Sequence, residues 1–217
     1  MISNNFIHPY QLGGFKYRFT TDTRVALTHS IQSDWIKNLY TSTVTFDTTQ
    51  FFPSLNHHLL LLILNKAGFN QKILIFFSNY LVNRKTKYLW NNFSSPLCNI
   101  DVGVSQESAF SLILSTLYLS LIFYIFKKCL KNLNIPISVL SFVDNGLFIS
   151  QSKLLSISNT NLFCSYNIIL SLLIRFRFVM EHSKTEIFHF SRSHGTFNPS
   201  PLDLTSLDGP TLLSKLI

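Results

Sequence analysis

Two aspartates that lie far apart in this sequence have the surroundings of metal-binding carboxylates. Asp47 directly follows a short β-prone run, and Asp144 lies in Phe142-Val143-Asp144-Asn145, at an expected hairpin turn between two apolar runs. Two carboxylates at one edge of a sheet can hold two magnesium ions about 3.5–4 Å apart for phosphoryl-type transfer. A single aspartate after a strand is more often a turn or cap residue. The pair together predicts a metal site, with Asn145 where a further carboxylate would be expected.

A sheet has to bring these carboxylates together, and the apolar pattern predicts its strands. Thr43 to Phe46 is expected to form a strand that ends at Asp47. Ile137 to Val143 and Leu147 to Ser150 are expected to form a hairpin around Asp144-Asn145-Gly146. Asn and Gly at the second and third of these turn positions favour the left-handed backbone of a tight turn. Asp144 is therefore expected at the tip of the hairpin.

The remaining elements are predicted from apolar spacing and from cap and turn residues. Helices are expected over residues 22–40, 56–66, 71–82, 108–126 and 156–176. Strands are expected over 86–90 and 97–102, joined by a turn-rich stretch at 91–96, and over 178–180 and 185–190.

Composition sets the class of protein. The 217 residues are 47% apolar and only 13% charged, which allows one good-sized core and excludes a disordered chain. The net charge of +8 permits nucleic-acid binding without indicating it. Cys98, Cys129 and Cys164 are too dispersed for a disulfide framework or a zinc site. The N-terminal residues do not have the pattern of a signal peptide.

One segment has the composition of a membrane span. The run from Ser108 to Phe126 carries no charge and is followed at once by Lys127 and Lys128. Its hydropathy and cationic flank are typical of a transmembrane helix, but a helix buried in a protein core has the same composition. The segment alone leaves both interpretations open.

Six short motifs occur in the order found in reverse transcriptases. They are Gln11-Leu-Gly-Gly-Phe15, Thr20-Thr21-Asp22, Phe46-Asp47-Thr-Thr-Gln-Phe51-Phe52, Gly103-Val-Ser-Gln106-Glu107-Ser108, Phe142-Val-Asp144-Asn145 and Glu181-His-Ser-Lys184-Thr185. From about Gln11 to Leu204 the chain resembles the reverse transcriptase domain of LINE-type, non-LTR retrotransposons, and among these the fungal Tad-like elements. Each motif alone is loose, whereas six in order are specific.

The resemblance implies an α+β fold. It predicts a reverse transcriptase-like domain over residues 1–204, with partial fingers at 1–42 and mainly palm at 43–190, the palm being an antiparallel sheet with packed helices. The thumb is expected to be missing, and residues 191–217 to form a poorly ordered tail. The apolar helix at 108–126 is expected to pack against the back of the palm sheet rather than to span a membrane.

The resemblance also implies roles for the residues around the aspartates. Asp47 and Asp144 match the ligands of two Mg²⁺ ions, and Asn145 stands at the family's second hairpin aspartate. Phe52 matches the bulky residue under the incoming sugar, and Lys184 matches a lysine near the triphosphate.

Two further groups are expected to contact substrates. Gln106 and Ser108 match the loop that contacts template and nucleotide. The basic residues Arg84, Lys85 and Lys87 are expected either to contact the phosphate backbone or to form a solvated surface cluster.

The function implied is RNA-directed DNA synthesis, with an RNA template, a DNA primer, dNTP and magnesium as partners, in the nucleus or cytoplasm. The chain departs from the family at Asn145, Glu107, Ser183 and Leu112, so we expect weakened metal binding and an inactive enzyme. Each departure is one G-to-A or C-to-T transition from the family residue, which suggests a decayed copy. The alternatives are a non-catalytic nucleic-acid-binding remnant and a small membrane protein spanning residues 108–126.

Overall fold

An antiparallel sheet lies at the centre of the computed structural model, which describes residues 6–14, 17–106, 108, 110–192 and 214–216. Its strands run in the order β10 (Ile187–Phe190), β1 (Tyr40–Phe46), β8 (Asn145–Ser152) and β7 (Ile137–Phe142). β11 (Ser214–Leu216) joins β10 in parallel, a strand that was not expected in the tail. Residues 193–213 and 217 of the tail that was expected to be poorly ordered lie outside the described residues.

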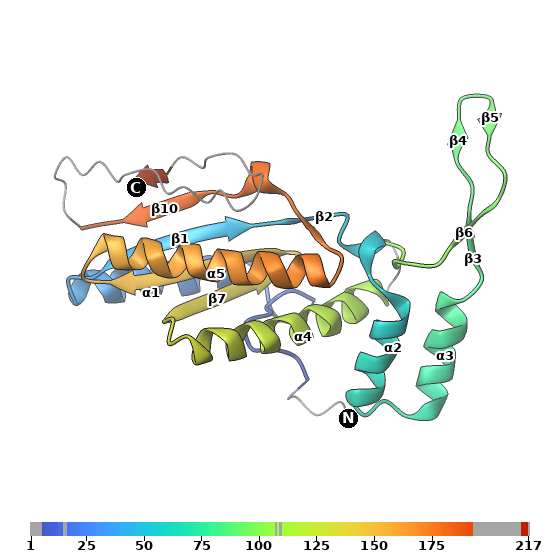
Figure 1. Cartoon of the computed structure of the whole chain (residues 1–217), viewed down its shortest axis with the longest axis horizontal. Helices are drawn as coiled ribbons and strands as arrows, with labels where there is room; N and C mark the ends of the chain where they lie inside the picture. Colours follow the sequence, from blue (N-terminus) through green and yellow to red (C-terminus); the bar gives the residue numbers. More distant parts are fainter. Residues whose placement is uncertain (1–5, 15–16, 107, 109, 193–213, 217) are drawn as a thin grey trace.

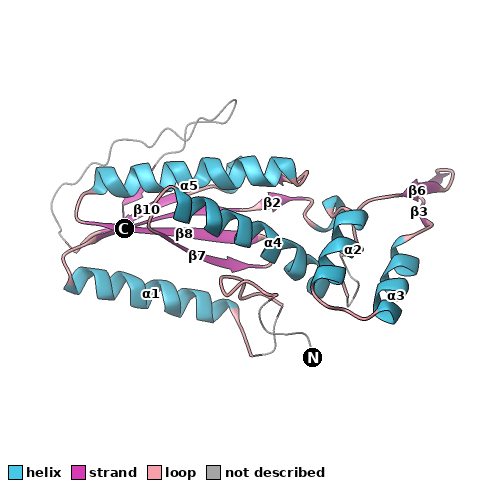
Figure 2. Ribbon diagram, turned by 60° about the horizontal axis from the view of Figure 1, so that its bottom comes forward, coloured by secondary structure: helices cyan, strands magenta, loops and turns pink. Residues whose placement is uncertain are grey.

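Helices cover both faces of this sheet, which gives the mixed α and β fold that was predicted. α4 (Ser111–Asn132) and α5 (Leu155–Arg175) lie over one face, and α1 (Thr20–Ile36) lies over the other (Figure 1, Figure 2). Phe148 of the sheet stacks on Phe126 of α4 with ring centroids 5.2 Å apart, and Phe46 lies 4.9 Å from Phe148. The main core is therefore on the α4–α5 face.

α4 and α5 are both long and apolar enough to cross a membrane by length and composition. In the fold, 56% of the apolar window of α4 and 39% of that of α5 is buried against other elements. The side chains of Leu114, Tyr118 and Phe126 are fully buried. These contacts favour the core-helix interpretation of the segment that begins at Ser108.

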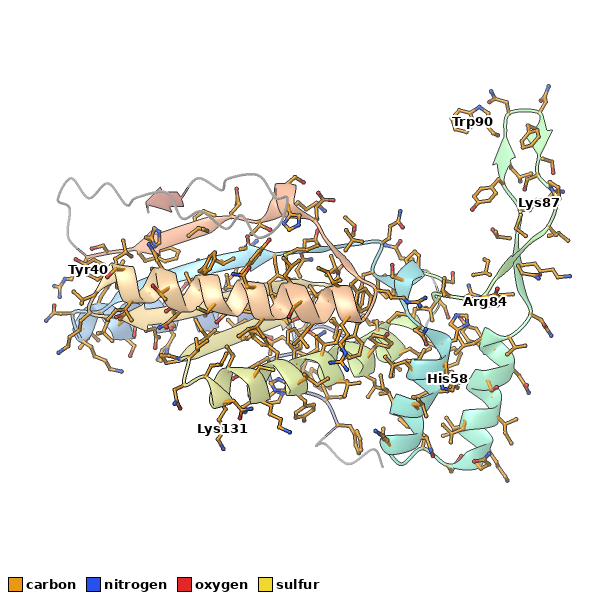
Figure 3. All side chains as sticks on the ribbon, viewed as in Figure 1. Tyr40, His58, Arg84, Lys87, Trp90 and Lys131 are labelled. Carbon is orange, nitrogen blue, oxygen red and sulfur yellow. The ribbon has the colours of Figure 1, made fainter. Side chains whose placement is uncertain are left out.

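Two shorter helices and a hairpin extend from the end of the sheet. α2 (His57–Lys66) and α3 (Gln71–Leu81) pack side by side, and the side chains of Asn56 and Asn70 accept hydrogen bonds that cap them. After α3 the chain forms a long hairpin that projects from the body (Figure 1, Figure 3). It consists of β3 (Arg84–Thr86), β4 (Leu89–Trp90), β5 (Phe93–Ser94) and β6 (Cys98–Ile100).

This hairpin, residues 84–100, is called the arm below. A hairpin was predicted here, but with two continuous strands over 86–90 and 97–102. The structure instead has two short ladders, β3 with β6 and β4 with β5, and a two-residue turn at Asn91 and Asn92. Asn91 takes a positive φ of 50°, which asparagine tolerates well.

The segment before α1 lies along the free edge of β7. Gln11 forms a parallel bridge with Ser141, the Leu12 N–H donates to the Ser141 carbonyl at 2.8 Å, and the Ser141 N–H donates to the Tyr10 carbonyl at 2.8 Å. This part of the expected fingers region, residues 1–42, therefore contacts the sheet that carries Asp144.

The register of β1 against β8 places Phe46 opposite Gly146. The Phe46 ring occupies the space above Gly146: a Cβ on that glycine would lie 2.0 Å from a ring carbon. Glycine in a strand commonly marks such a close approach. The prediction that Asn145 and Gly146 form the turn was wrong, because β8 begins at Asn145 and the turn residues are Val143 and Asp144.

Gly146→Ala is expected to destabilise the fold by about 1–3 kcal/mol, because the added methyl group overpacks the buried Phe46 ring. Urea unfolding followed by circular dichroism measures this loss. In a Phe46→Leu background the smaller side chain leaves room, so the penalty of Gly146→Ala should shrink by at least about 0.5 kcal/mol. Equal penalties in the two backgrounds would contradict the close contact.

Candidate metal and nucleotide site

The first carboxylate lies where β1 ends. Asp47 directly follows β1, and its carbonyl accepts a hydrogen bond of 2.9 Å from the Glu181 N–H. Beyond it, β2 (Thr48–Thr49) pairs with β9 (Val179–Met180). The backbone of Asp47 is thus held by the segment that leads to Lys184, and its side chain is only 12% exposed.

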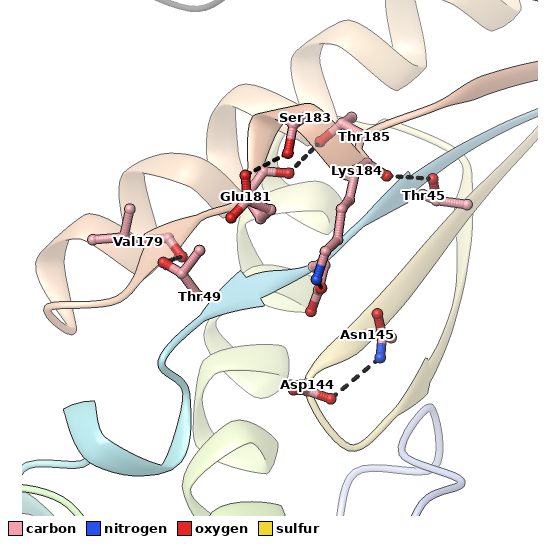
Figure 4. Close-up of polar contacts among 10 residues, drawn as sticks. Thr45, Thr49, Asp144, Asn145, Val179, Glu181, Ser183, Lys184 and Thr185 are labelled. Atoms are coloured by element: carbon pink, nitrogen blue, oxygen red, sulfur yellow. Dashed lines mark hydrogen bonds and ion pairs between the residues drawn. The ribbon is translucent and has the colours of Figure 1, made fainter. Parts of the chain in front are cut away.

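The second carboxylate lies at the tip of the β7–β8 hairpin, as predicted for Asp144. The β1–β8 register brings this tip next to the end of β1, so the two aspartates share one edge of the sheet. The charge of Asp47 is one of the influences that raise the pKa of Asp144. Figure 4 shows the hairpin tip facing Lys184 and the end of β1.

Lys184 neutralises Asp47. It belongs to the short 3-10 helix η2 (His182–Lys184), and its Nζ lies 2.7 Å from Oδ2 of Asp47 (Figure 4). This hydrogen bond, together with the Asp47 charge, raises the pKa of Lys184, so the lysine is cationic at neutral pH. The predicted ligand Asp47 and the predicted phosphate-binding Lys184 therefore form an ion pair.

Asn145 faces Asp144. Its Nδ2 donates a hydrogen bond of 3.2 Å to Oδ1 of Asp144. Burial raises the pKa of the Asp144 carboxyl, and the charge of Asp47 raises it further, while its own backbone N–H and Lys184 oppose the rise. The largest of these influences is burial, which disfavours the charged form of Asp144.

The hairpin tip has an unfavourable backbone that the N-terminal segment supports. Val143 takes a positive φ of 57°, a conformation that costs a β-branched residue about 1–3 kcal/mol. Nε2 of the buried Gln11 donates to the Val143 carbonyl at 3.1 Å. Gly13 lies so close that a Cβ there would be 2.5 Å from the Val143 nitrogen. Gln11 and Gly13 belong to the first motif, but nothing in the motif indicates that they support the hairpin.

A groove of about 420 Å³ runs from these residues along the sheet face that α1 partly covers. Asp47, Asn145 and Lys184 line one part of it. Its apolar lining comes mainly from the sheet: Leu140, Phe142, Leu147, Phe188 and Phe190. An apolar groove with a few charged groups at one end is typical of a ligand site.

The other predicted nucleotide contacts are Phe52, at the start of a 3-10 helix, and Gln106 and Ser108, on a loop. The carbonyl of Phe52 accepts from the Val104 N–H at 2.9 Å, which docks the Gly103 loop beside the 3-10 helix η1 (Phe52–Ser54). Ser108 accepts a hydrogen bond of 2.7 Å from the Tyr80 hydroxyl of α3. Gln106 is exposed, and Glu107 lies outside the described residues. Ser108 is thus tied to α3 rather than to the carboxylates.

The predicted basic contacts divide into two kinds. Arg84 donates from Nη1 to the Gly103 carbonyl at 2.8 Å, so it holds the base of the arm against the loop. Lys85 and Lys87 are exposed, and the arm that carries them projects away from the sheet (Figure 1). The structure therefore does not bring these three residues into the site of Asp47 and Asp144.

The fold is similar to that of solved telomerases, which are reverse transcriptase-related enzymes. A Candida tropicalis telomerase in complex with the TWJ fragment of telomeric RNA matches 96% of this chain with a TM-score of 0.65 and 15% identity. Apo telomerase from Candida tropicalis, truncated from the C-terminal domain, matches 88% with a TM-score of 0.62 and 13% identity. A Candida albicans telomerase with the TWJ fragment matches 90% with a TM-score of 0.54 and 14% identity.

These likenesses establish a reverse transcriptase-like fold. The chain spans 37%, 35% and 34% of the first three telomerase chains that it matches, so it corresponds to about a third of each. No protein-family model matches the sequence, and no curated protein matches it.

Asp144→Asn is expected to stabilise the protein at neutral pH. Because the folded state raises the pKa of Asp144, any stability from this group is present below its ordinary pKa of 3.8 and is lost as pH rises through the folded value. Urea unfolding should therefore give Asp144→Asn a larger free energy of unfolding than wild type at pH 7, and the difference should disappear near pH 3. The exposed Asp101→Asn serves as the control. A gain that is equal at both pH values would contradict the raised pKa.

Proposed function

We propose that this chain is the palm and part of the fingers of a reverse transcriptase of non-LTR retrotransposon origin, and that it no longer synthesises DNA. The observation that carries the proposal is the meeting of Asp47 and Asp144 at one sheet edge, with Asn145 in place of a third carboxylate. The reverse transcriptase-like fold and the motif order support the same assignment. An RNA template, a DNA primer and dNTP are the proposed ancestral partners.

The residues present fit one divalent cation better than two. Asp47 and Asp144 offer carboxylate oxygens, the ligands that magnesium prefers. Lys184 already engages Oδ2 of Asp47, and the Asn145 amide engages Oδ1 of Asp144. Among the described residues no group of three acidic, histidine or cysteine side chains could hold a metal ion. Two ions would share only two formal negative charges.

When bound, a divalent cation would polarise phosphoryl oxygens and favour a deprotonated hydroxyl nucleophile. The residues of this chain would contribute position and charge. Asp47 and Asp144 would hold the ion, and Lys184 would neutralise phosphate oxygens once it leaves Asp47. The groove beside them would accommodate apolar parts of the substrate. Asn145 brings no charge to this arrangement, which is the main reason for the proposed inactivity.

The positions of the altered residues support a loss of catalytic activity without a loss of the fold. Asn145 faces Asp144, the Ser183 hydroxyl contacts Glu181, and Leu112 is 38% exposed on α4. None of these three side chains is in the buried core, so the fold accommodates each change. The fourth, Glu107, lies outside the described residues. An excess of G-to-A and C-to-T changes in the coding DNA, relative to an intact relative, would support this origin, and its absence would contradict it.

Asn145→Asp is expected to strengthen metal binding. A further carboxylate about 4 Å from a cation is worth several kcal/mol per unit charge at the effective dielectric of a protein surface. Even if desolvation offsets part of this attraction, the added carboxylate should tighten Mn²⁺ binding by at least about tenfold. Titration calorimetry on wild type, Asn145→Asp and Asp47→Asn measures it, and Asp47→Asn should abolish binding. Equal affinity for wild type and Asn145→Asp would contradict the proposed ligand position.

Primer extension on an RNA template tests the activity itself. With magnesium or manganese, the wild-type chain is expected to extend the primer no more than the Asp47→Asn variant does. Asn145→Asp combined with Glu107→Gly is expected to add nucleotides in a metal-dependent way. Extension by wild type above the Asp47→Asn background would overturn the proposed inactivity.

A further inference from the structure

The arm carries a concentration of exposed aromatic side chains that the candidate site does not use. Tyr88, Trp90 and Phe93 are 67%, 76% and 63% exposed. Among the described residues, none of these three rings stacks on another ring or on a cation. Trp90 points away from the arm near its tip (Figure 3). Exposed aromatic groups in such a cluster commonly mark a binding surface.

The geometry of the arm places these rings on one side. Trp90 and Phe93 are directly opposite each other in the β4–β5 ladder, and cross-strand partners point to the same face. Tyr88 precedes Trp90 by two residues, so strand alternation puts it on that face as well. Hydrogen bonds between Tyr88 and Ser95 continue the pairing toward the base: the Ser95 N–H donates to the Tyr88 carbonyl at 2.9 Å, and the Tyr88 N–H donates to Oγ of Ser95 at 2.9 Å.

The charge of the arm indicates what would cover the rings. Residues 84–100 include Arg84, Lys85 and Lys87 and no aspartate or glutamate. Arg84 is bonded to the Gly103 carbonyl, whereas Lys85 and Lys87 are exposed. By the same alternation Lys87, next to Tyr88, points to the opposite face from the rings, so the phosphates of a bound strand would run along the edge of the arm. A ligand that matches both features has to be polyanionic and has to present flat apolar faces.

We propose that the arm binds single-stranded nucleic acid, with bases stacked on Trp90, Phe93 and Tyr88 and phosphates near Lys85 and Lys87. Single strands expose their bases, and stacking on aromatic side chains together with basic contacts is the general mode of sequence-tolerant binding. A continuous duplex hides its base faces and would use only the lysines. The inference rests on the proposed function only in taking nucleic acid as the partner, because the arm is separate from the Asp47–Asp144 site.

The test is fluorescence anisotropy with a labelled single-stranded RNA, on the full chain. Since one stacked base contributes about 1–3 kcal/mol, Trp90→Ala with Phe93→Ala should weaken binding by about tenfold or more. Ile36→Ala, which removes another exposed apolar side chain at the opposite end of the molecule, should leave affinity unchanged. Far-UV circular dichroism checks that each variant is folded.

The lysines and the rings are separable by salt dependence. Lys85→Ala with Lys87→Ala should reduce the slope of log affinity against log salt by about 1.4, because each phosphate contact on a single strand contributes about 0.7. The ring variant should keep the wild-type slope. In a Trp35→Phe background, RNA should quench the fluorescence of Trp90, the remaining tryptophan.

Several outcomes would overturn the proposal. These are unchanged RNA affinity in the ring variant, equal affinity for duplex and single strand, and self-association that depends on the rings while RNA binding does not. The last result would make the arm an interface between copies of the chain. The ring and lysine variants leave Asp47 and Asp144 intact, so a failed Asn145→Asp metal or extension test would count against the proposed function and not against the arm.

Discussion

The pairing of β1 with β8 is the interaction on which both the core and the candidate site depend. Phe46 points into the α4–α5 core, and the next residue, Asp47, lines the groove on the other side of the sheet. A shift of the register by one residue would exchange these two positions and would point a carboxylate into the apolar core. The Phe46 ring fits against Gly146 because the glycine has no side chain. This one glycine therefore affects both the packing of the core and the position of the Asp47 carboxylate.

The sequence predicted the elements well where their local chemistry was sufficient. α2 and α3 lie close to the expected ranges, with Asn56 and Asn70 capping them, and Asp144 lies at a hairpin tip. The turn itself was misplaced because Asn145-Gly146 is a strong turn pair by local preference. Position 146 has to be glycine because the Phe46 ring fills the space of a side chain there. Phe46 is a hundred positions away in the sequence, so a local pattern cannot reveal this constraint.

The candidate site was predictable in its carboxylates but not in its contacts. The order of the motifs predicted that Asp47, Asp144 and Lys184 lie near one another. In the structure they lie at the same end of the sheet, where β1 ends and β8 begins. The motif order did not indicate that Arg84 and Ser108 have partners within the protein, namely Gly103 and Tyr80. Such partners depend on how loops dock, and residue type and spacing carry little information about docking. The aromatic residues of the arm likewise have the pattern of ordinary strand residues, which does not indicate that their rings are exposed.

The support of the hairpin by Gln11 has a consequence for how the molecule folds. Gln11 and Val143 are 132 residues apart in the chain, yet one hydrogen bond joins them and compensates a strained turn. Contacts between such distant residues form slowly, because the loop between them has to close first. The geometry around Asp144 is therefore complete only once this contact has formed, and the pairings of β1 with β8 and β10 join residues that are similarly far apart in the chain. A nascent chain that has not yet brought its two distant segments together would contain both aspartates without a site.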